Sequence, residues 1–122
     1  MILQRGGVRL LGIARSFASS KLVHEVTSTD DFRKKIAASP QPVLVDFYAN
    51  WCGPCKALTP RLTKKVEADA GKWILLKVDI DNPSNEKVCE EFKVAAVPTL
   101  VLMKNGKEVA KKMGALSDEA LV

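Results

Sequence analysis

Residues Val43–Lys56 read VLVDFYANWCGPCK, and this stretch decides the fold. Its first six residues form a nearly continuous run of aliphatic and aromatic side chains, which is typical of a central strand covered on both faces. A Cys-x-x-Cys pair follows, and beyond it Leu58, Leu62 and Val66 recur at intervals of four, which predicts an amphipathic helix. The cysteine pair is therefore expected where a buried strand ends and a helix begins.

Strand-like and helix-like segments alternate on both sides of this stretch. The other elements expected are a strand over Lys21–Val26, a helix from the N-cap Thr29 to Pro40, a strand over Trp73–Val78, a helix from Asn82 through Phe92, and strands over Thr99–Met103 and Glu108–Lys111. Asn105-Gly106 predicts a two-residue hairpin turn between the last two strands. Pro60 lies inside the central helix and is expected to kink it. The order predicts an α/β sandwich with an antiparallel final hairpin.

The composition is that of an ordinary folded domain. The chain has 122 residues, of which 47% are hydrophobic and 27% charged, which excludes disordered, collagen-like and coiled-coil proteins. Three cysteines are too few, and odd in number, for a disulfide-stapled scaffold. No apolar run approaches the ~20 residues of a membrane span, so no membrane partner is expected.

The positive charge is concentrated at the N-terminus. The formal net charge is +5, yet residues 1–20 contain Arg5, Arg9 and Arg15 and no acidic residue. The rest of the chain is nearly neutral, which removes the argument for a nucleic-acid partner. Arginines among apolar and small residues are typical of a mitochondrial transit peptide, predicted here over residues 1–19 with cleavage near 17–19. A plain basic arm is the alternative. Residues 20–122 then form the domain.

The cysteine pair admits three interpretations: a zinc site, a chance pair in the core, or a redox dithiol. Structural zinc needs four ligands, and only Cys89 and His24 remain to supply them. A Gly-Pro dipeptide between the cysteines favours a turn over a packed helix interior. At a helix start, unpaired N–H groups and the helix dipole lower the pKa of Cys52 and favour the reactive thiolate, while Cys55 can resolve the intermediate. No Gly-rich nucleotide fingerprint and no metal-ligand cluster occurs in the sequence, so no bound cofactor and no metal are expected.

These residues resemble the thioredoxin family. The resemblance runs from Val45–Lys56 through later motifs over about residues 22–122, namely Pro60, Lys77-Val78-Asp79, Val97-Pro98-Thr99, Lys104-Asn105-Gly106 and Gly114. It implies a three-layer α/β/α sandwich around a central mixed sheet. The chain is also similar to disulfide isomerases, which usually carry Gly-His between the cysteines, whereas Gly53-Pro54 resembles the reducing members.

The resemblance assigns roles to individual residues. It implies that Cys52 is the nucleophile, that Cys55 resolves the intermediate, and that the two form a redox disulfide. It makes Asp46 a buried carboxylate that transfers the Cys55 proton, with Lys77 as its partner. From the residues alone, Asp46 could be a solvent-exposed strand end and Lys77 a surface lysine.

A substrate-docking surface is implied around Cys52. Its expected members are Trp51, Gly53, Pro54, Val97, Pro98, Gly106 and Gly114. The family implies a cis bond before Pro98, although a trans proline at a strand start is the expectation from the residues alone. The turn itself is also a sufficient explanation for Gly106.

The resemblance further implies a protein-disulfide reductase of the mitochondrial matrix. Its electrons are expected from NADPH through a flavoprotein thioredoxin reductase, its clients are protein disulfides such as those of peroxiredoxins and methionine sulfoxide reductases, and a monomer is expected. The alternatives are a disulfide oxidase or isomerase, and a non-catalytic thioredoxin-like adaptor.

Three features depart from the family pattern. Tyr48 stands where many members have tryptophan, and Cys89, expected to be a buried and inert thiol, has no counterpart. The family ends in a long helix, whereas this chain contains six residues of it, Ser117–Val122. We therefore expect a C-terminal helix cut short, with Val101, Met103 or Val109 left uncovered and the stability lowered.

Overall fold

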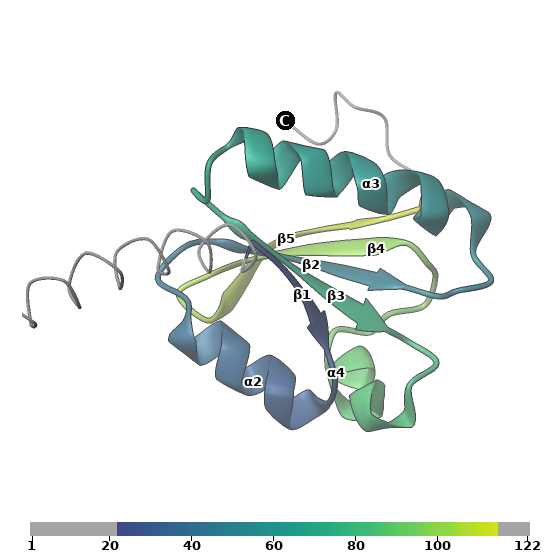
Figure 1. Cartoon of the computed structure of the whole chain (residues 1–122). Helices are drawn as coiled ribbons and strands as arrows, with labels where there is room; N and C mark the ends of the chain where they lie inside the picture. The colour runs from purple at the N-terminus through teal and green to yellow at the C-terminus, as the bar shows by residue number, and fades with distance from the viewer. Residues whose placement is uncertain (1–21, 115–122) are drawn as a thin grey trace, which may run out of the picture.

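Five strands form one mixed sheet in the order β1-β3-β2-β4-β5 (Figure 1). The structure is a computed structural model and describes residues 22–114. The expected transit peptide and the short C-terminal helix both lie outside the described residues. The strands are β1 (Val23–Val26), β2 (Val43–Tyr48), β3 (Ile74–Asp79), β4 (Thr99–Lys104) and β5 (Lys107–Met113). Strands β1, β3 and β2 run parallel, whereas β4 is antiparallel to β2 and β5 is antiparallel to β4.

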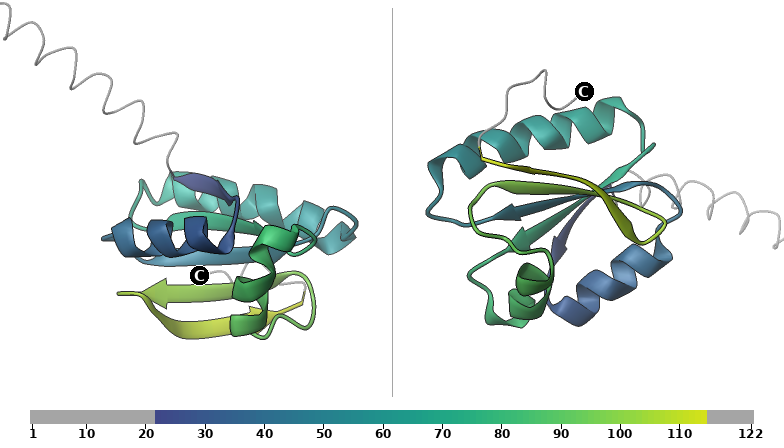
Figure 2. Two further views of the ribbon diagram at one scale, coloured as in Figure 1. Left: turned by 90° about the horizontal axis from the view of Figure 1, so that it is seen from below. Right: turned by 180° about the vertical axis from the view of Figure 1, so that it is seen from behind.

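Helices cover both faces of this sheet, which confirms the predicted three-layer α/β/α sandwich. Helix α3 (Gly53–Ala68) lies on one face, and α2 (Thr29–Ala38) and α4 (Glu86–Glu91) lie on the other (Figures 1 and 2). A short 3-10 turn, η1 (Pro83–Asn85), leads into α4. No helix within residues 22–114 is long and apolar enough to cross a membrane.

The two layers of core follow from the alternation of the central strands. On the α3 side, Leu58 and Leu62 pack with Leu75 and Leu100. On the other side, the rings of Phe32 and Phe47 lie 5.7 and 5.8 Å from that of Phe92 and join the even-numbered residues of β3 in one cluster. Both faces of β2 and β3 are therefore buried, as the continuous apolar runs predict.

The predicted elements are present, with shifts at their ends. The N-cap of α2 is Ser28, one residue before the expected Thr29, because the Ser28 hydroxyl accepts the N–H of Asp31 at 3.0 Å. Helix α3 continues through Pro60 as one element.

The Asn105-Gly106 turn is confirmed. The φ angles of Asn105 and Gly106 are 53° and 78°, the left-handed values that a type I′ hairpin turn requires at both central residues. Strand β4 therefore turns directly into β5 at the end of the sheet where β2 begins, opposite to the end where α3 starts.

One expectation about the last strands is wrong. Val101 and Met103 are 0% and 5% exposed, because both belong to the cluster covered by α2 and α4 and do not depend on a C-terminal helix. Val109 on β5 is 52% exposed.

Candidate active site

Cys52 is the N-cap residue of α3, directly after the loop that leaves β2. The backbone N–H of Cys55 donates to Cys52 Sγ at 3.1 Å. The two cysteines form a disulfide, with their Cα atoms 5.3 Å apart. Both are almost completely buried in this oxidised state, with 4% and 2% of their surface exposed, so Cys55 is only slightly the more enclosed of the two.

The start of α3 suits the chemistry of a thiolate. The unpaired N–H groups and the positive end of the helix dipole point at Cys52 Sγ, which therefore occupies the place where a helix stabilises negative charge. Pro54, in the first turn, lacks a donor where donors have no helical acceptor, and its ring fixes the helical φ angle.

Asp46 lies completely buried in β2, on the face that α3 covers. The Thr59 hydroxyl donates to Asp46 Oδ2 at 3.0 Å, whereas Oδ1 has no hydrogen-bond partner among the described residues. Cys55 and Thr59 are four residues apart and share one face of α3, so this carboxyl lies beneath the dithiol. Burial raises the pKa of Asp46 to about 6, although the Thr59 hydrogen bond and the charge of Lys77 act in the opposite direction.

Lys77 pairs with Asp46 in the register of β2 and β3, but its ion pair is made with a different carboxylate. Its Nζ lies 3.6 Å from Glu25 Oε1 on β1 and 5.1 Å from the centre of the Tyr48 ring. The Tyr48 hydroxyl in turn donates to Glu25 Oε2 at 2.7 Å. Lys77 therefore acts on Asp46 through its charge while it is held by Glu25 and Tyr48.

A small cavity adjoins these groups. It has a volume of about 160 Å³ and is lined by Tyr48, Ala49, Asn50, Cys55, Lys56, Thr59 and Lys77. Because Cys55 and Lys77 line the same cavity, the second cysteine of the pair and the cross-strand lysine share one local environment.

The loop that contains Pro98 packs against the disulfide. The Val97–Pro98 peptide bond is cis, as the family resemblance implies. Val97 packs against the cluster formed by Ala49, Cys52 and Cys55. The N–H of Gly114 donates to the Pro98 carbonyl at 2.8 Å, so the end of β5 is also held beside this loop.

The outer rim of the site is exposed. The Trp51 side chain is 70% exposed, and its Nε1 donates to Asp81 Oδ2 at 2.9 Å. Gly53 and Pro54 are also exposed. These residues give the disulfide an exposed border that a protein substrate can contact.

Gly106 does not belong to this rim, which corrects the expectation from the sequence. Strand β4 begins at Thr99 opposite Phe47, near the dithiol, and runs antiparallel to β2. The turn at Gly106 therefore lies at the opposite end of the strands, where β2 begins, and its glycine is explained by the positive φ alone.

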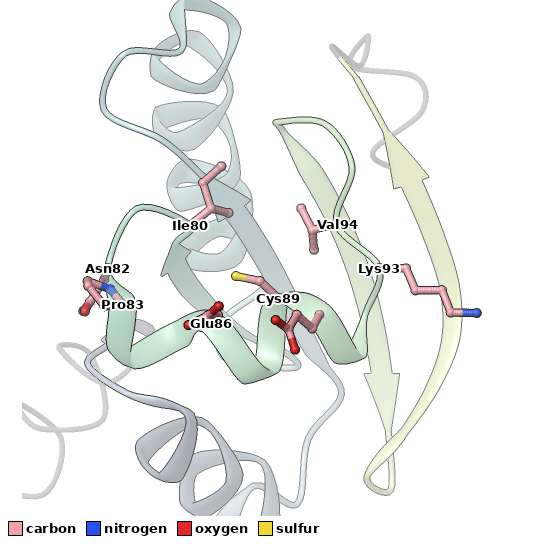
Figure 3. Close-up of a pocket in the computed structure, with 8 residues that line it drawn as sticks. Ile80, Asn82, Pro83, Glu86, Cys89, Lys93 and Val94 are labelled. Atoms are coloured by element: carbon pink, nitrogen blue, oxygen red, sulfur yellow. The ribbon is translucent and has the colours of Figure 1, made fainter.

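Cys89 lies on α4, away from the dithiol. It is half-buried rather than fully buried as expected, and it lines an open pocket of about 370 Å³ between α4 and the segment after β3. Figure 3 shows its sulfur on the side of α4 that faces Ile80. Burial, together with the negative charges of Asp79 and Glu90, raises the pKa of the Cys89 thiol. Its surroundings therefore disfavour the reactive thiolate.

Sequence reasoning missed the roles of Thr59 and Glu25. Thr59 follows Cys55 by one helical turn, a spacing that could have placed it beneath the dithiol. No local sequence pattern points to Glu25, because its contact with Lys77 depends on which strand lies beside β3. Within residues 22–114, no group of three or more His, Cys, Asp or Glu side chains is placed to hold a metal ion.

A disulfide-forming pair at the start of this helix, in this sandwich, defines the class: a thiol–disulfide oxidoreductase domain. The family model described as Thioredoxin matches residues 23–122, and the chain belongs to the thioredoxin family.

Relatives and solved structures agree with this assignment. The chain is 40% identical over 111 residues to the mitochondrial thioredoxin of Rattus norvegicus, covering 88% of this chain and 66% of that protein. It is 46% identical over 91 residues to that of Bos taurus, covering 75% and 54%. The chain thus spans about two thirds of the rat protein and about half of the bovine one. The structure of oxidised mitochondrial thioredoxin 3 from Saccharomyces cerevisiae is similar, with a TM-score of 0.71, 36% identity and coverage of 84% of this chain and 92% of that chain.

Proposed function

We propose that this chain is a protein-disulfide reductase that acts through a mixed disulfide with its substrate. The observation that carries the proposal is the position of Cys52 at the N-terminus of α3, with the Cys55 N–H on its sulfur. This position stabilises the Cys52 thiolate, which is the species that attacks a disulfide.

The first step joins the substrate to Cys52. The Cys52 thiolate attacks one sulfur of a substrate disulfide, a new S–S bond forms, and the other substrate sulfur leaves as a thiolate. In the second step the Cys55 thiolate attacks Cys52 Sγ. The mixed disulfide breaks, the second substrate sulfur leaves, and the Cys52–Cys55 disulfide forms, so that two electrons have passed to the substrate.

The second step needs Cys55 to lose a proton, and we assign that proton to Asp46. The carboxyl lies beneath the dithiol with Oδ1 free of hydrogen bonds among the described residues. Its pKa of about 6 lets it be ionised at neutral pH and still accept a proton transiently. Lys77 supports the ionised form of Asp46 through its charge.

The rim of the site supports a protein substrate. Exposed Trp51, Gly53 and Pro54 offer a surface beside the disulfide. The partly exposed Val97 packs against the disulfide and extends this surface, while the buried Pro98 fixes the course of the loop. The backbone groups of Val97 are assigned to an extended substrate segment, in the manner of an added strand.

The source of the electrons and the cellular location are proposed by analogy with the family. We assign reduction of the disulfide to an NADPH-dependent flavoprotein thioredoxin reductase, and client disulfides to enzymes such as peroxiredoxins and methionine sulfoxide reductases. The arginine-rich residues 1–19 and the mitochondrial relatives support the mitochondrial matrix. A reporter carrying residues 1–20 should enter mitochondria, and the mature protein should begin near Ala18 or Ser19. A cytosolic reporter would contradict the assignment.

Insulin reduction tests the activity. The purified chain with NADPH and a thioredoxin reductase should precipitate reduced insulin, and the Cys52→Ser variant should not. The reduction potential separates the alternatives: a potential near the −270 mV typical of thioredoxin supports a reductase, and one near −120 to −180 mV supports an oxidase or isomerase. A chain that forms no reducible disulfide at all would favour the adaptor.

A further inference from the structure

Three charged residues lie in one row across three adjacent strands. Glu25 on β1 pairs with Lys77 on β3, and Lys77 pairs with Asp46 on β2. Side chains paired in this way project from the same face of a sheet. The row therefore lies on the face that α3 covers, with the lysine between two carboxylates.

Of the two carboxylates in the row, Glu25 is the one that forms an ion pair with Lys77. Lys77 Nζ lies 3.6 Å from Glu25 Oε1, whereas Asp46 accepts the Thr59 hydroxyl on Oδ2 and nothing among the described residues on Oδ1. About half of the Glu25 side chain is exposed, so it can hold the ammonium near solvent, while Asp46 is completely buried. Lys77 is thus bound by Glu25 at the solvent-exposed β1 end of the row, and not at the buried β2 end, where Asp46 lies.

Tyr48 fixes this arrangement from the side. It stands two residues after Asp46 on β2 and projects from the same face. Its hydroxyl donates to Glu25 Oε2 at 2.7 Å, and Lys77 Nζ lies over its ring at 5.1 Å. Both oxygens of Glu25 are therefore engaged, one by Tyr48 and one by Lys77.

We propose that Glu25 is a positioning residue for the reaction at Cys55: with Tyr48 it holds the Lys77 ammonium at the β1 end of the row, and so limits the positive charge that Asp46 experiences. The inference rests on the proposed function, in which Asp46 accepts the Cys55 proton. A lysine free to turn toward Asp46 would stabilise the ionised carboxylate and make it a weaker base.

The other groups around Asp46 do not replace this control. On the same strand, Tyr48 is a phenol and is therefore neutral at physiological pH, and burial raises its pKa further. From α3, Thr59 is uncharged, and Cys55 and Lys56 lie at the cavity. On β4, the paired residue is the apolar Leu100. Lys77 and Glu25 are the charges that act on Asp46 from the sheet, with opposite signs.

The test is a carboxyl NMR titration of Asp46 in the oxidised protein, where the dithiol does not titrate. Glu25→Gln keeps an acceptor for Tyr48, removes one negative charge and releases Lys77. We expect the pKa of Asp46 to fall by about 1 or more. The lost charge of the half-exposed Glu25, two strand spacings or about 10 Å away, accounts for about 0.3 to 0.5 at an effective dielectric constant of about 50 to 80. The released Lys77 ammonium accounts for the larger part. The acid limb of the pH–activity profile should move in the same direction.

A double variant separates positioning from simple charge. In a Lys77→Gln background, Glu25→Gln should lower the pKa of Asp46 by less than half as much. Equal decreases in both backgrounds, or a change below about 0.2 in the first, would overturn the proposal. The matched control is Glu108→Gln on exposed β5, which changes net charge equally and should leave the pKa of Asp46 unchanged. A control decrease equal to that of Glu25→Gln would likewise overturn it.

A further variant, Asp46→Asn, distinguishes this inference from the proposed function. If Asp46→Asn leaves insulin reduction unchanged, the proton-transfer role of Asp46 is wrong. The positional coupling of Glu25 and Lys77 is read from the titration alone and stands or falls independently of that result.

Discussion

The hydroxyl of Thr59 donates to Asp46 Oδ2 at 3.0 Å and so joins α3 to β2 beneath the dithiol. Oδ2 thus accepts a hydrogen bond, whereas Oδ1 of the same buried carboxyl has no hydrogen-bond partner among the described residues. An ionised carboxylate with one such bond in a dry environment is destabilising. The site therefore keeps a titratable group whose burial lowers the stability of the folded protein when the group is ionised.

Asp46→Asn should stabilise the protein at neutral pH. The folded-state pKa of Asp46, about 6, lies above its ordinary value of 3.8, so the folded protein binds the proton more tightly than the unfolded chain. Stability contributed by the native aspartate is therefore lost as pH rises from about 4 to about 6. The difference corresponds to about 3 kcal/mol, as an order of magnitude.

Urea unfolding of the oxidised protein at several pH values measures this effect. The advantage of Asp46→Asn should be small at pH 4, grow through pH 5 and 6, and level off by pH 7. Thr59→Val serves as a control for loss of the hydrogen bond, because it should destabilise the protein at pH 7, where the carboxylate is ionised. An Asp46→Asn advantage independent of pH would show that the carboxyl does not titrate as described.

The two active-site cysteines should have separable roles. Cys52→Ser should abolish insulin reduction, because no thiolate remains at the start of α3. Cys55→Ser should accumulate a stable mixed disulfide, because no second thiol expels the substrate. Non-reducing electrophoresis with a client protein detects that species. In the reduced wild type, iodoacetamide near neutral pH should modify Cys52 first, and faster modification of Cys55 would reverse the assignment.

The parts of this structure that local patterns encode were predictable from sequence. The apolar run of β2, the stripe of α3 and the Asn105-Gly106 turn each depend on residues close together in the chain. Cys52, Cys55 and Asp46 fall within ten consecutive residues, so the strand–helix junction places them together. The family motifs supplied the cis bond before Pro98, which the residues alone did not predict.

The remaining parts depend on how the strands are ordered. Glu25 meets Lys77 only because β1 lies beside β3, and the pattern within either strand does not carry that information. The family motif places Gly106 in the docking surface, but β4 runs antiparallel to β2, so Gly106 lies at the end of the strands away from the dithiol. Val101 and Met103 were expected to need a C-terminal helix, and they face α2 and α4 instead.

Trp51 should affect protein substrates more than small ones. Its ring is 70% exposed and is held by the Asp81 hydrogen bond, so it offers a rigid apolar contact beside the disulfide. Trp51→Ala should lower kcat/KM for insulin about tenfold, or about 1.4 kcal/mol, which is more than truncation of most interface residues costs. Reduction of a small aromatic disulfide should change less than about twofold, since it needs only the dithiol.

A matched exposed residue controls for loss of surface apolarity. Val109 is 52% exposed on β5, and Val109→Ala should leave both substrates unaffected. Equal losses for insulin and for the small disulfide in Trp51→Ala would indicate that the tryptophan supports the dithiol itself and does not dock the substrate.

Cys89 should be a slow and dispensable thiol. Burial and the charges of Asp79 and Glu90 raise its pKa, so its thiolate fraction near pH 7 is smaller than that of an ordinary cysteine. In reduced protein, mass spectrometry after brief iodoacetamide treatment should find Cys89 modified at least about tenfold more slowly than Cys52, with a rate that keeps rising above pH 9.

Cys89→Ala should leave insulin reduction within about twofold and cost about 1 kcal/mol of stability, because the side chain packs against the α2–α4 core. Glu90→Gln removes one of the raising charges and should speed the modification of Cys89 while leaving that of Cys52 unchanged. If Cys89 reacted as fast as Cys52, its environment would have to favour the thiolate, whereas the charges that shift its pKa, those of Asp79 and Glu90, are negative.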